Sequence, residues 1–250
     1  MNELAGSAES LIIKNDGSRI ICERELIREH ILSVIVNEQP LYRMTCTREY
    51  LKELISGRLY TDGLIASADD IDKLYFCRYE NEASVYLKHD ITTAGGSAVE
   101  PSCCTGNRVY ADIKRRAALC RLPDHDWKPE WVFALAERFS EGTKLHHKTS
   151  GTHSCFLARE NELLFSCEDI GRHNAVDKAV GYGLLNGIDL TECMIYSSGR
   201  VPIDMVQKVI AAGIPLLVSK SVPSIESTEL AKEYNLNLVC RAYPDQIEVY

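Results

Sequence analysis

Two adjacent cysteines, Cys103 and Cys104, are the residues of this chain best suited to covalent chemistry. They lie within residues 92–107, TTAGGSAVEPSCCTGN, a segment rich in small residues and without hydrophobic periodicity. Such a segment predicts a long mobile loop, and long loops in compact proteins are usually functional or disordered. Thiols on such a loop are poor core filler, so the sequence favours a reactive thiol, which would act as the thiolate.

A second candidate site consists of three polar turns, each following a short apolar run and each carrying a cation. The first apolar run, 163–165, precedes the turn 169–174 (DIGRHN). The second run, 194–196, precedes the turn 197–200 (SSGR), and the third, 215–218, precedes the turn 219–221 (SKS). Small residues and cations beside a helix N-terminus suit an anion, most simply a phosphate. Any one turn could be purely structural, with Arg172 and Arg200 as ordinary surface cations. Three such turns in one sheet favour an anion site.

Repeated strand–turn–helix units must position these turns. Val176, Ala179 and Val180 fall on one helical face after the first turn, and Met205, Val206 and Val209 do the same after the second. Strands that alternate with helices predict a mostly parallel sheet with helices packed on it. The turns should then share one edge of the sheet, where ligands bind in open α/β proteins.

The chain divides into four parts on this interpretation. Residues 1–10 are polar and are expected to be disordered, and residues 11–91 form a smaller N-terminal α+β region. Residues 92–107 form the mobile cysteine loop, and residues 108–250 carry the strand–helix units.

Composition excludes several classes of protein. The 250 residues are 45% hydrophobic and carry a net charge of −8, which allows a substantial core and disfavours general binding to nucleic acid. The start lacks a signal-peptide pattern, and no apolar run approaches the roughly 18 residues of a membrane span. A soluble cytoplasmic protein is therefore expected. The ten cysteines include no C-x-x-C pair, so no metal site is predicted.

Three segments closely resemble the formate dehydrogenase accessory sulfurtransferases, the FdhD family. They read GTHSCFLARENELLFSCEDIGRHNAVDKAVGYGLLNGIDL, SSGRVPIDMVQKVIAAGIPLLVSKSVPS and SGRLYTDGLIASADDI. The resemblance runs from about Leu32 to Tyr250. It implies an α/β fold whose C-terminal cofactor-binding domain is a three-layer structure like cytidine deaminase, without its zinc chemistry.

The resemblance also implies a function. The family takes sulfur from a cysteine desulfurase as a cysteine persulfide. It passes this sulfur to the molybdenum (or tungsten) bis(molybdopterin guanine dinucleotide) cofactor before the cofactor enters formate dehydrogenase. GDP is the expected mimic of that cofactor. A homodimer is expected from the resemblance alone.

Site residues follow from the same resemblance. Cys103 is the favoured persulfide carrier, and Cys104 is the alternative if the loop aligns with the family's glycine-rich version. The segment from Arg241 to Gln246 departs from the family pattern, because its cations are displaced or lost. The implied cofactor-binding residues are Gly171, Arg172, His173, Asn174, Lys178, Ser197, Ser198, Gly199, Arg200, Ser219, Lys220, Arg241, Ala242, Tyr243, Pro244, Asp245 and Gln246.

Two other functions stay open at this point. The chain could be a chaperone that binds the molybdenum cofactor without carrying covalent sulfur. A deaminase-like hydrolase is a weaker alternative, since the P-C-x-x-C zinc motif is missing. Detection of a persulfide separates carrier from chaperone, and a metal assay tests the hydrolase.

Overall fold

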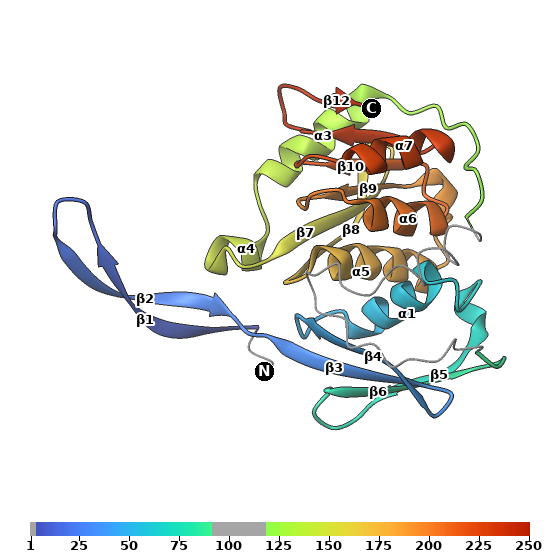
Figure 1. Cartoon of the computed structure of the whole chain (residues 1–250), viewed down its shortest axis with the longest axis horizontal. Coiled ribbons are helices and arrows are strands. Elements are labelled where there is room, and N and C mark those ends of the chain that lie inside the picture. The colour runs from blue at the N-terminus through green and yellow to red at the C-terminus, as the bar shows by residue number, and fades with distance from the viewer. Residues whose placement is uncertain (1–3, 92–118) are drawn as a thin grey trace.

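The computed structural model describes residues 4–91 and 119–250. Its strands form a six-stranded sheet, a four-stranded sheet and a two-stranded hairpin that extends away from the body (Figure 1). The segment 92–107, with Cys103 and Cys104, lies outside the described residues. The fold is therefore mixed α/β.

The six-stranded sheet has the order β12-β11-β10-β9-β7-β8. Its strands are β7 His153–Arg159, β8 Glu162–Asp169, β9 Met194–Ser197, β10 Leu216–Ser219, β11 Asn237–Cys240 and β12 Glu248–Val249. The pairs β9–β10 and β10–β11 are parallel, whereas β7 pairs antiparallel with both β8 and β9. The predicted mostly parallel sheet is thus wrong in part, because β7 is antiparallel to both of its neighbours and β12 is antiparallel to β11. The strands β8 to β11 nevertheless all run in the same direction.

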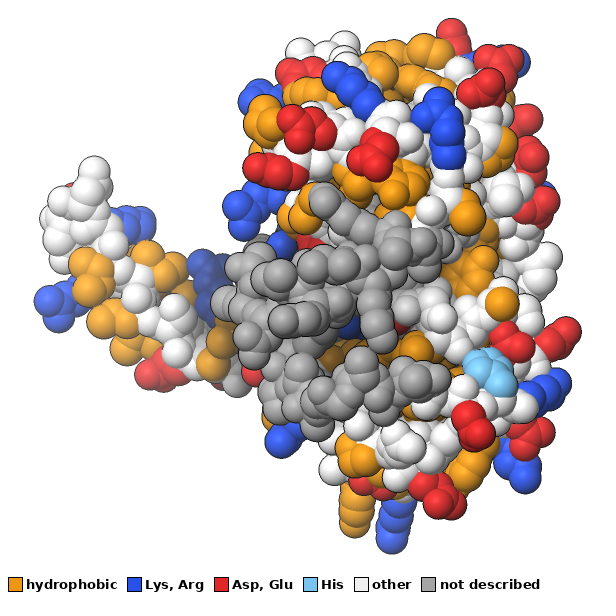
Figure 2. Space-filling view, turned by 45° about the vertical axis from the view of Figure 1, so that its right-hand side comes forward, with side chains coloured by type: hydrophobic (Ala, Val, Ile, Leu, Met, Phe, Trp, Pro, Cys, Tyr) orange, Lys and Arg blue, Asp and Glu red, His pale blue; other side chains and the backbone are white. Residues whose placement is uncertain are grey.

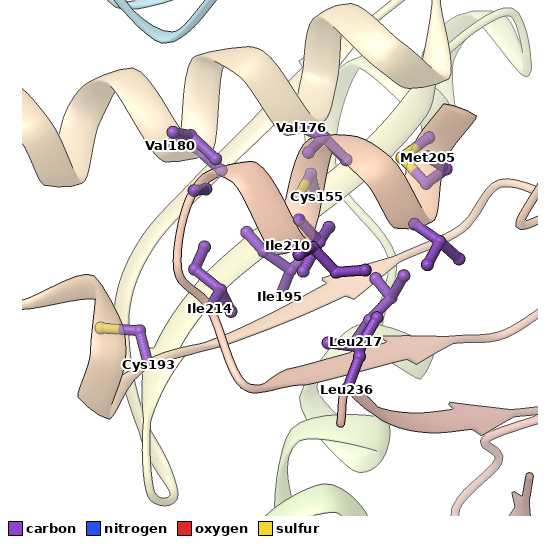
Figure 3. Packing of buried hydrophobic residues seen from close by; sticks show 14 of the residues in the cluster. Cys155, Val176, Val180, Cys193, Ile195, Met205, Ile210, Ile214, Leu217 and Leu236 are labelled. Atoms are coloured by element: carbon purple, nitrogen blue, oxygen red, sulfur yellow. The ribbon is translucent and has the colours of Figure 1, made fainter. Parts of the chain in front are cut away.

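Helices cover both faces of this sheet. The helices are α3 Pro129–Ser140, α4 Lys144–Thr149, α5 Arg172–Leu185, α6 Ile203–Ala211 and α7 Ile225–Glu233, with a 3₁₀ turn at Leu190–Glu192. One core joins α5, α6 and α7 to side chains such as Ile195 and Leu217. Figure 3 shows the part of this core that α5 and α6 contribute. A second core joins α3 to Met194, Tyr196 and Val218. Successive residues of β9 and β10 enter opposite cores, which explains why these strands are continuous apolar runs. The result is three layers.

The N-terminal region forms a separate sheet of order β4-β3-β6-β5. It consists of β3 His30–Val36, β4 Gln39–Cys46, α1 Leu51–Thr61, a 3₁₀ turn at Ala68–Asp70, β5 Ile71–Phe76 and β6 Glu82–Leu87. Helix α1 buries Leu54, Ile55 and Leu59 against this sheet. Its other side packs on α5, so α1 joins the two halves (Figure 1).

Two glycines allow α1 and α5 to approach closely. A Cβ atom on Gly57 would overlap the carbonyl oxygen of Asp177, and one on Gly181 would overlap that of Glu53. We expect Gly181→Ala to lower the free energy of unfolding by at least about 3 kcal/mol, since backbone atoms are the obstacle. Gly63→Ala is the control, because this glycine has φ +72° but open space around it. It should lose only about 1–2 kcal/mol. Equal losses in urea denaturation would contradict the close-packing argument.

The predicted disorder of residues 1–10 is wrong from Ala5 onward. Strand β1, Ala5–Ile13, pairs antiparallel with β2, Arg19–Ile27, and a turn at Asn15-Asp16-Gly17 joins them. The polar composition of the start concealed the strand, because its aliphatic residues come late, from Leu11 to Ile13. Among the described helices, none is long and apolar enough to cross a membrane.

Candidate functional site

Four strand ends meet at one edge of the six-stranded sheet, as the sequence predicts. Strand β8 ends at Asp169, β9 at Ser197, β10 at Ser219 and β11 at Cys240. Ser197 lies beside Ser219 in the parallel ladder. The three predicted turns therefore lie next to one another, and the turn after β11 joins them.

Hydrogen bonds fix these turns to each other. The backbone N–H of Lys220 donates to the carbonyl of Ser197 at 3.0 Å, and that of Ala242 donates to the carbonyl of Ser219 at 3.0 Å. The Ser219 hydroxyl donates to the carbonyl of Gly199 at 2.7 Å. The turns after β9, β10 and β11 thus form one connected surface.

The turn after β8 joins this surface through a close contact at Gly199. A Cβ atom on Gly199 would lie 2.8 Å from the Cβ of Arg172, so a side chain there would push α5 away. The start of β7 fills the space between β8 and β9, and His153 Nδ1 lies 3.2 Å from the Ser198 hydroxyl oxygen. Arg172 and His153 therefore belong to the same edge.

Cations dominate this edge. Arg172 is half-buried, whereas Arg200, Lys220 and Arg241 are exposed. Burial, and then the positive charges of Arg172 and His146, hold the pKa of His153 below its usual value. The imidazole is therefore neutral at neutral pH. A bound anion would offset this repulsion and favour the protonated form.

Arg241 has left-handed backbone with φ 42°, and its Nε atom lies 3.5 Å from a Glu248 carboxylate oxygen. The following residues, Ala242 and Tyr243, are buried and half-buried, whereas Pro244, Asp245 and Gln246 are exposed. Of this predicted segment, only Arg241 brings a positive charge to the edge.

Five predicted ligand-binding polar side chains are buried: Ser197 and Ser219 within the turns, and three more on α5 inside the protein. Lys178 is fully buried, with its Nζ atom 2.7 Å from Asp169 Oδ2 and 2.6 Å from Thr47 Oγ1. Asn174 donates to Asp169 Oδ1 at 2.9 Å, and His173 pairs with Asp204 at 3.1 Å. The structure does not bring these three side chains to the surface of the edge. They hold α5 in place.

A second buried ion pair escaped the sequence analysis. Lys208 on α6 contacts both carboxylate oxygens of Asp177 on α5 at 2.7 and 2.8 Å, and both residues bond the Thr61 hydroxyl. Asp169 and Asp177 are thus each neutralised by a lysine. The sequence offers no signal for this pairing, because the partners are distant along the chain.

Glu168 is another residue that the sequence analysis missed. Its carboxylate accepts from the backbone N–H groups of Leu145 and His146 at 2.8 and 2.7 Å, and from the Thr152 hydroxyl at 2.9 Å. This carboxylate fixes the start of α4 and the entry to β7. It therefore positions His153 indirectly.

Five of the described cysteines are buried, and burial raises the pKa of each of their thiols. It raises the pKa of the Cys46 thiol to about 12, that of Cys193 to about 11 and that of Cys240 to about 12, and it also raises those of Cys155 and Cys167. These five thiols are poor nucleophiles at neutral pH. Among the described residues, no group of three or more His, Cys, Asp or Glu side chains could hold a metal ion.

The fold and this edge define a class of protein: a mixed α/β protein that presents a cationic surface along its strand ends. The chain belongs to the FdhD/NarQ family, whose profile matches residues 27–250. The resemblance seen in the sequence is thereby confirmed.

Curated relatives and one solved structure agree with this assignment. A sulfur carrier protein FdhD from Listeria monocytogenes is 29% identical over 234 residues, covering 91% of this chain and 90% of that protein. One from Bacillus subtilis is 29% identical over 221 residues, covering 87% and 84%. The crystal structure of a formate dehydrogenase accessory protein from Desulfotalea psychrophila is similar with a TM-score of 0.79. It is 25% identical, and the alignment covers 99% of this chain and 96% of that chain.

Proposed function

We propose that this chain is a sulfur carrier that serves formate dehydrogenase. The observation that carries the proposal is its family membership, together with relatives named sulfur carriers that align along about nine-tenths of the chain. The sulfur would come from a cysteine desulfurase and travel as a persulfide on Cys103, with Cys104 as the alternative carrier. It would then pass to the molybdenum bis(molybdopterin guanine dinucleotide) cofactor, which is the substrate.

The proposed loading step is a thiol exchange without net oxidation. The Cys103 thiolate attacks the outer sulfur of the desulfurase persulfide, a new S–S bond forms, and the desulfurase cysteine leaves as a thiolate. This step needs an ionised, accessible thiol. The five buried cysteines described above fit this requirement poorly, which supports a carrier elsewhere in the chain.

Three described cysteines, Cys22, Cys77 and Cys120, are outside this buried group, and the environment of Cys77 favours its thiolate. Burial opposes its ionisation, but the backbone N–H groups of Tyr79, Glu82 and neighbouring residues hold the pKa of the thiol below its usual value. Cys77 lies in the turn between β5 and β6, on the N-terminal sheet rather than at the cationic edge. It is therefore the thiol to use as a control.

The cationic edge is the proposed binding surface for the phosphates of the cofactor's guanine dinucleotide. Arg172, Arg200, Lys220 and Arg241 supply positive charge there. Cationic groups beside a helix N-terminus are typical of phosphate sites. We also propose a homodimer.

Mass spectrometry of the protein after incubation with a cysteine desulfurase and cysteine tests the proposed function. A mass gain of one sulfur atom, removed by a reducing agent, supports the carrier. A protein that binds GDP but gains no sulfur would be a non-covalent chaperone instead.

Substitution of two arginines tests the binding surface. We expect GDP to raise the melting temperature of the wild type, because a ligand that binds only the native state stabilises it. Arg172→Lys and Arg200→Lys should each weaken GDP binding by about 1–3 kcal/mol, since lysine cannot reproduce a two-pronged guanidinium contact. The melting temperature without ligand should hardly change. A loss of stability with unchanged GDP affinity would mean that the arginines are structural.

A further inference from the structure

His153 is a titratable residue that stands between two of the turns of the cationic edge. It begins strand β7, which lies between β8 and β9 in the sheet. It pairs with Asp169, the last residue of β8, and Cys155 two residues on pairs with Ser197, the last residue of β9. The imidazole is half-buried. It is therefore placed among the groups that the proposed function assigns to phosphate binding.

Ser198 holds this imidazole in position. Its hydroxyl oxygen accepts a hydrogen bond from the backbone N–H of Ser154 at 3.1 Å and lies 3.2 Å from His153 Nδ1. The backbone N–H of Ser198 donates to the Ser154 carbonyl at 3.0 Å, so two bonds join the turn after β9 to β7. A serine hydroxyl can donate to a neutral imidazole nitrogen or accept from a protonated one, because its hydrogen rotates. The turn after β9 thus presents an uncharged partner that suits both protonation states of His153.

The charges around His153 favour its neutral form in the free protein. Burial, and then Arg172 on α5 and His146 on α4, hold the pKa of the imidazole below its usual value. Asp169 on β8 acts in the opposite direction, but its carboxylate is 2.7 Å from the buried Lys178 Nζ atom. The one carboxylate among these influences is therefore already neutralised by a lysine.

The edge is positive although the protein as a whole is acidic. The net charge is −8, and acidic and basic side chains are interspersed over the face of the body in Figure 2. Arg172 approaches the turn after β9 closely, since a Cβ atom on Gly199 would lie 2.8 Å from the Cβ of Arg172. An anion bound between Arg172 and Ser198 would also lie near His153. Its negative charge would reverse the balance that keeps the imidazole neutral.

We propose that His153 is a further phosphate-binding residue of the cationic edge, and that its imidazole takes up a proton when the phosphates of a guanine nucleotide bind. The proton comes from solvent and binds at Nδ1, and the Ser198 hydroxyl turns from donor to acceptor. The Nε2–H group then donates to a phosphate oxygen, as a charge-assisted hydrogen bond. This inference rests on the proposed binding surface and adds the protonation state that the surface has when it is occupied.

Proton uptake links the affinity of the edge to pH. The complex binds more protons than the free protein and ligand do, so the affinity rises as the pH falls, by at most about tenfold per pH unit for one proton. The dependence lies between the pKa of His153 in the free protein, which is below its usual value, and its higher pKa in the complex. Above that window both states are neutral, and the proton no longer contributes.

Isothermal titration calorimetry of the full chain with GDP-mannose tests the proposal. Both phosphates of this ligand are diesters with no proton to exchange near neutral pH, whereas the terminal phosphate of GDP titrates at about pH 6. Titrations near neutral pH in two buffers of different ionisation enthalpy should show that the wild type takes up a fraction of one proton. Lowering the pH from about 8 to about 6 should tighten binding at least about threefold.

Two histidine variants identify the group that titrates. His153→Gln should abolish both the proton uptake and the pH dependence, because an amide can bond Ser198 but does not titrate. His146→Gln is the matched control: His146 is exposed on α4, with its Nδ1 atom 2.9 Å from the Thr152 carbonyl oxygen, and this variant should keep the uptake. A variant that only disturbs the structure would weaken binding equally at every pH.

An NMR titration of the His153 ring in the wild type needs no variant. The pKa of the imidazole should lie below its usual value in the free protein and at least about one unit higher in the complex. An unchanged pKa, or a proton uptake that survives His153→Gln, would overturn the role of His153 and leave the binding surface standing. If GDP-mannose binds at no pH, the binding surface itself is wrong, and the role of His153 is overturned with it.

Discussion

Replacing Cys103 with alanine is expected to abolish sulfur loading by a cysteine desulfurase. The sulfur needs a thiolate that can reach the desulfurase, and five of the described thiols are excluded by burial, which raises their pKa values. Mass spectrometry after incubation with desulfurase and cysteine should show no added sulfur on the variant, while the wild type gains one sulfur atom. Thermal unfolding of the variant should match the wild type.

Two further cysteine variants make this experiment decisive. Cys104→Ala should load sulfur with only a modest loss, since Cys104 is the alternative carrier. Cys77→Ala should load normally, although the pKa of this thiol is lowered. If Cys103→Ala loads at the normal yield and Cys104→Ala does not, the carrier is Cys104. Normal loading in both would place the carrier at another thiol.

Replacing Lys178 with methionine is expected to lower the free energy of unfolding by about 3–5 kcal/mol. Methionine fills a similar volume but leaves the Asp169 carboxylate charged and fully buried, with its lysine partner removed. The same substitution removes the bond from Lys178 to Thr47, which links α5 to the segment before α1. Urea denaturation measures the loss.

Two controls distinguish this structural role from ligand binding. Lys220→Met removes an exposed cation and should change stability by less than about 0.5 kcal/mol. The double variant Asp169→Asn with Lys178→Met should be more stable than Lys178→Met alone, because no buried charge is left unpaired. If Lys178→Met instead kept full stability and lost only GDP affinity, the buried ion pair would not be structural.

The local pattern of the sequence determined the elements around the site and their order. Short apolar runs predicted β8, β9 and β10, and helical spacing predicted α5 and α6. These signals are local, because a strand buried on both faces must be continuously apolar and a helix must show a 3.6-residue period. The shared direction of β8 to β11 then placed the predicted turns at one edge. The likeness of this domain to cytidine deaminases stays a prediction.

Tertiary contacts decided which polar residues face the ligand edge and which face the core. The resemblance to the family implies that His173 and Lys178 bind the cofactor, whereas both are buried on α5 together with Asp177. The structure packs α1 against α5, and Thr47 and Thr61 supply hydrogen bonds to these buried charges. The partners are more than a hundred residues apart in the chain, so no local pattern could pair them. The β1–β2 hairpin illustrates the same limit, because each strand is marginal alone and is specified only by its cross-strand partner.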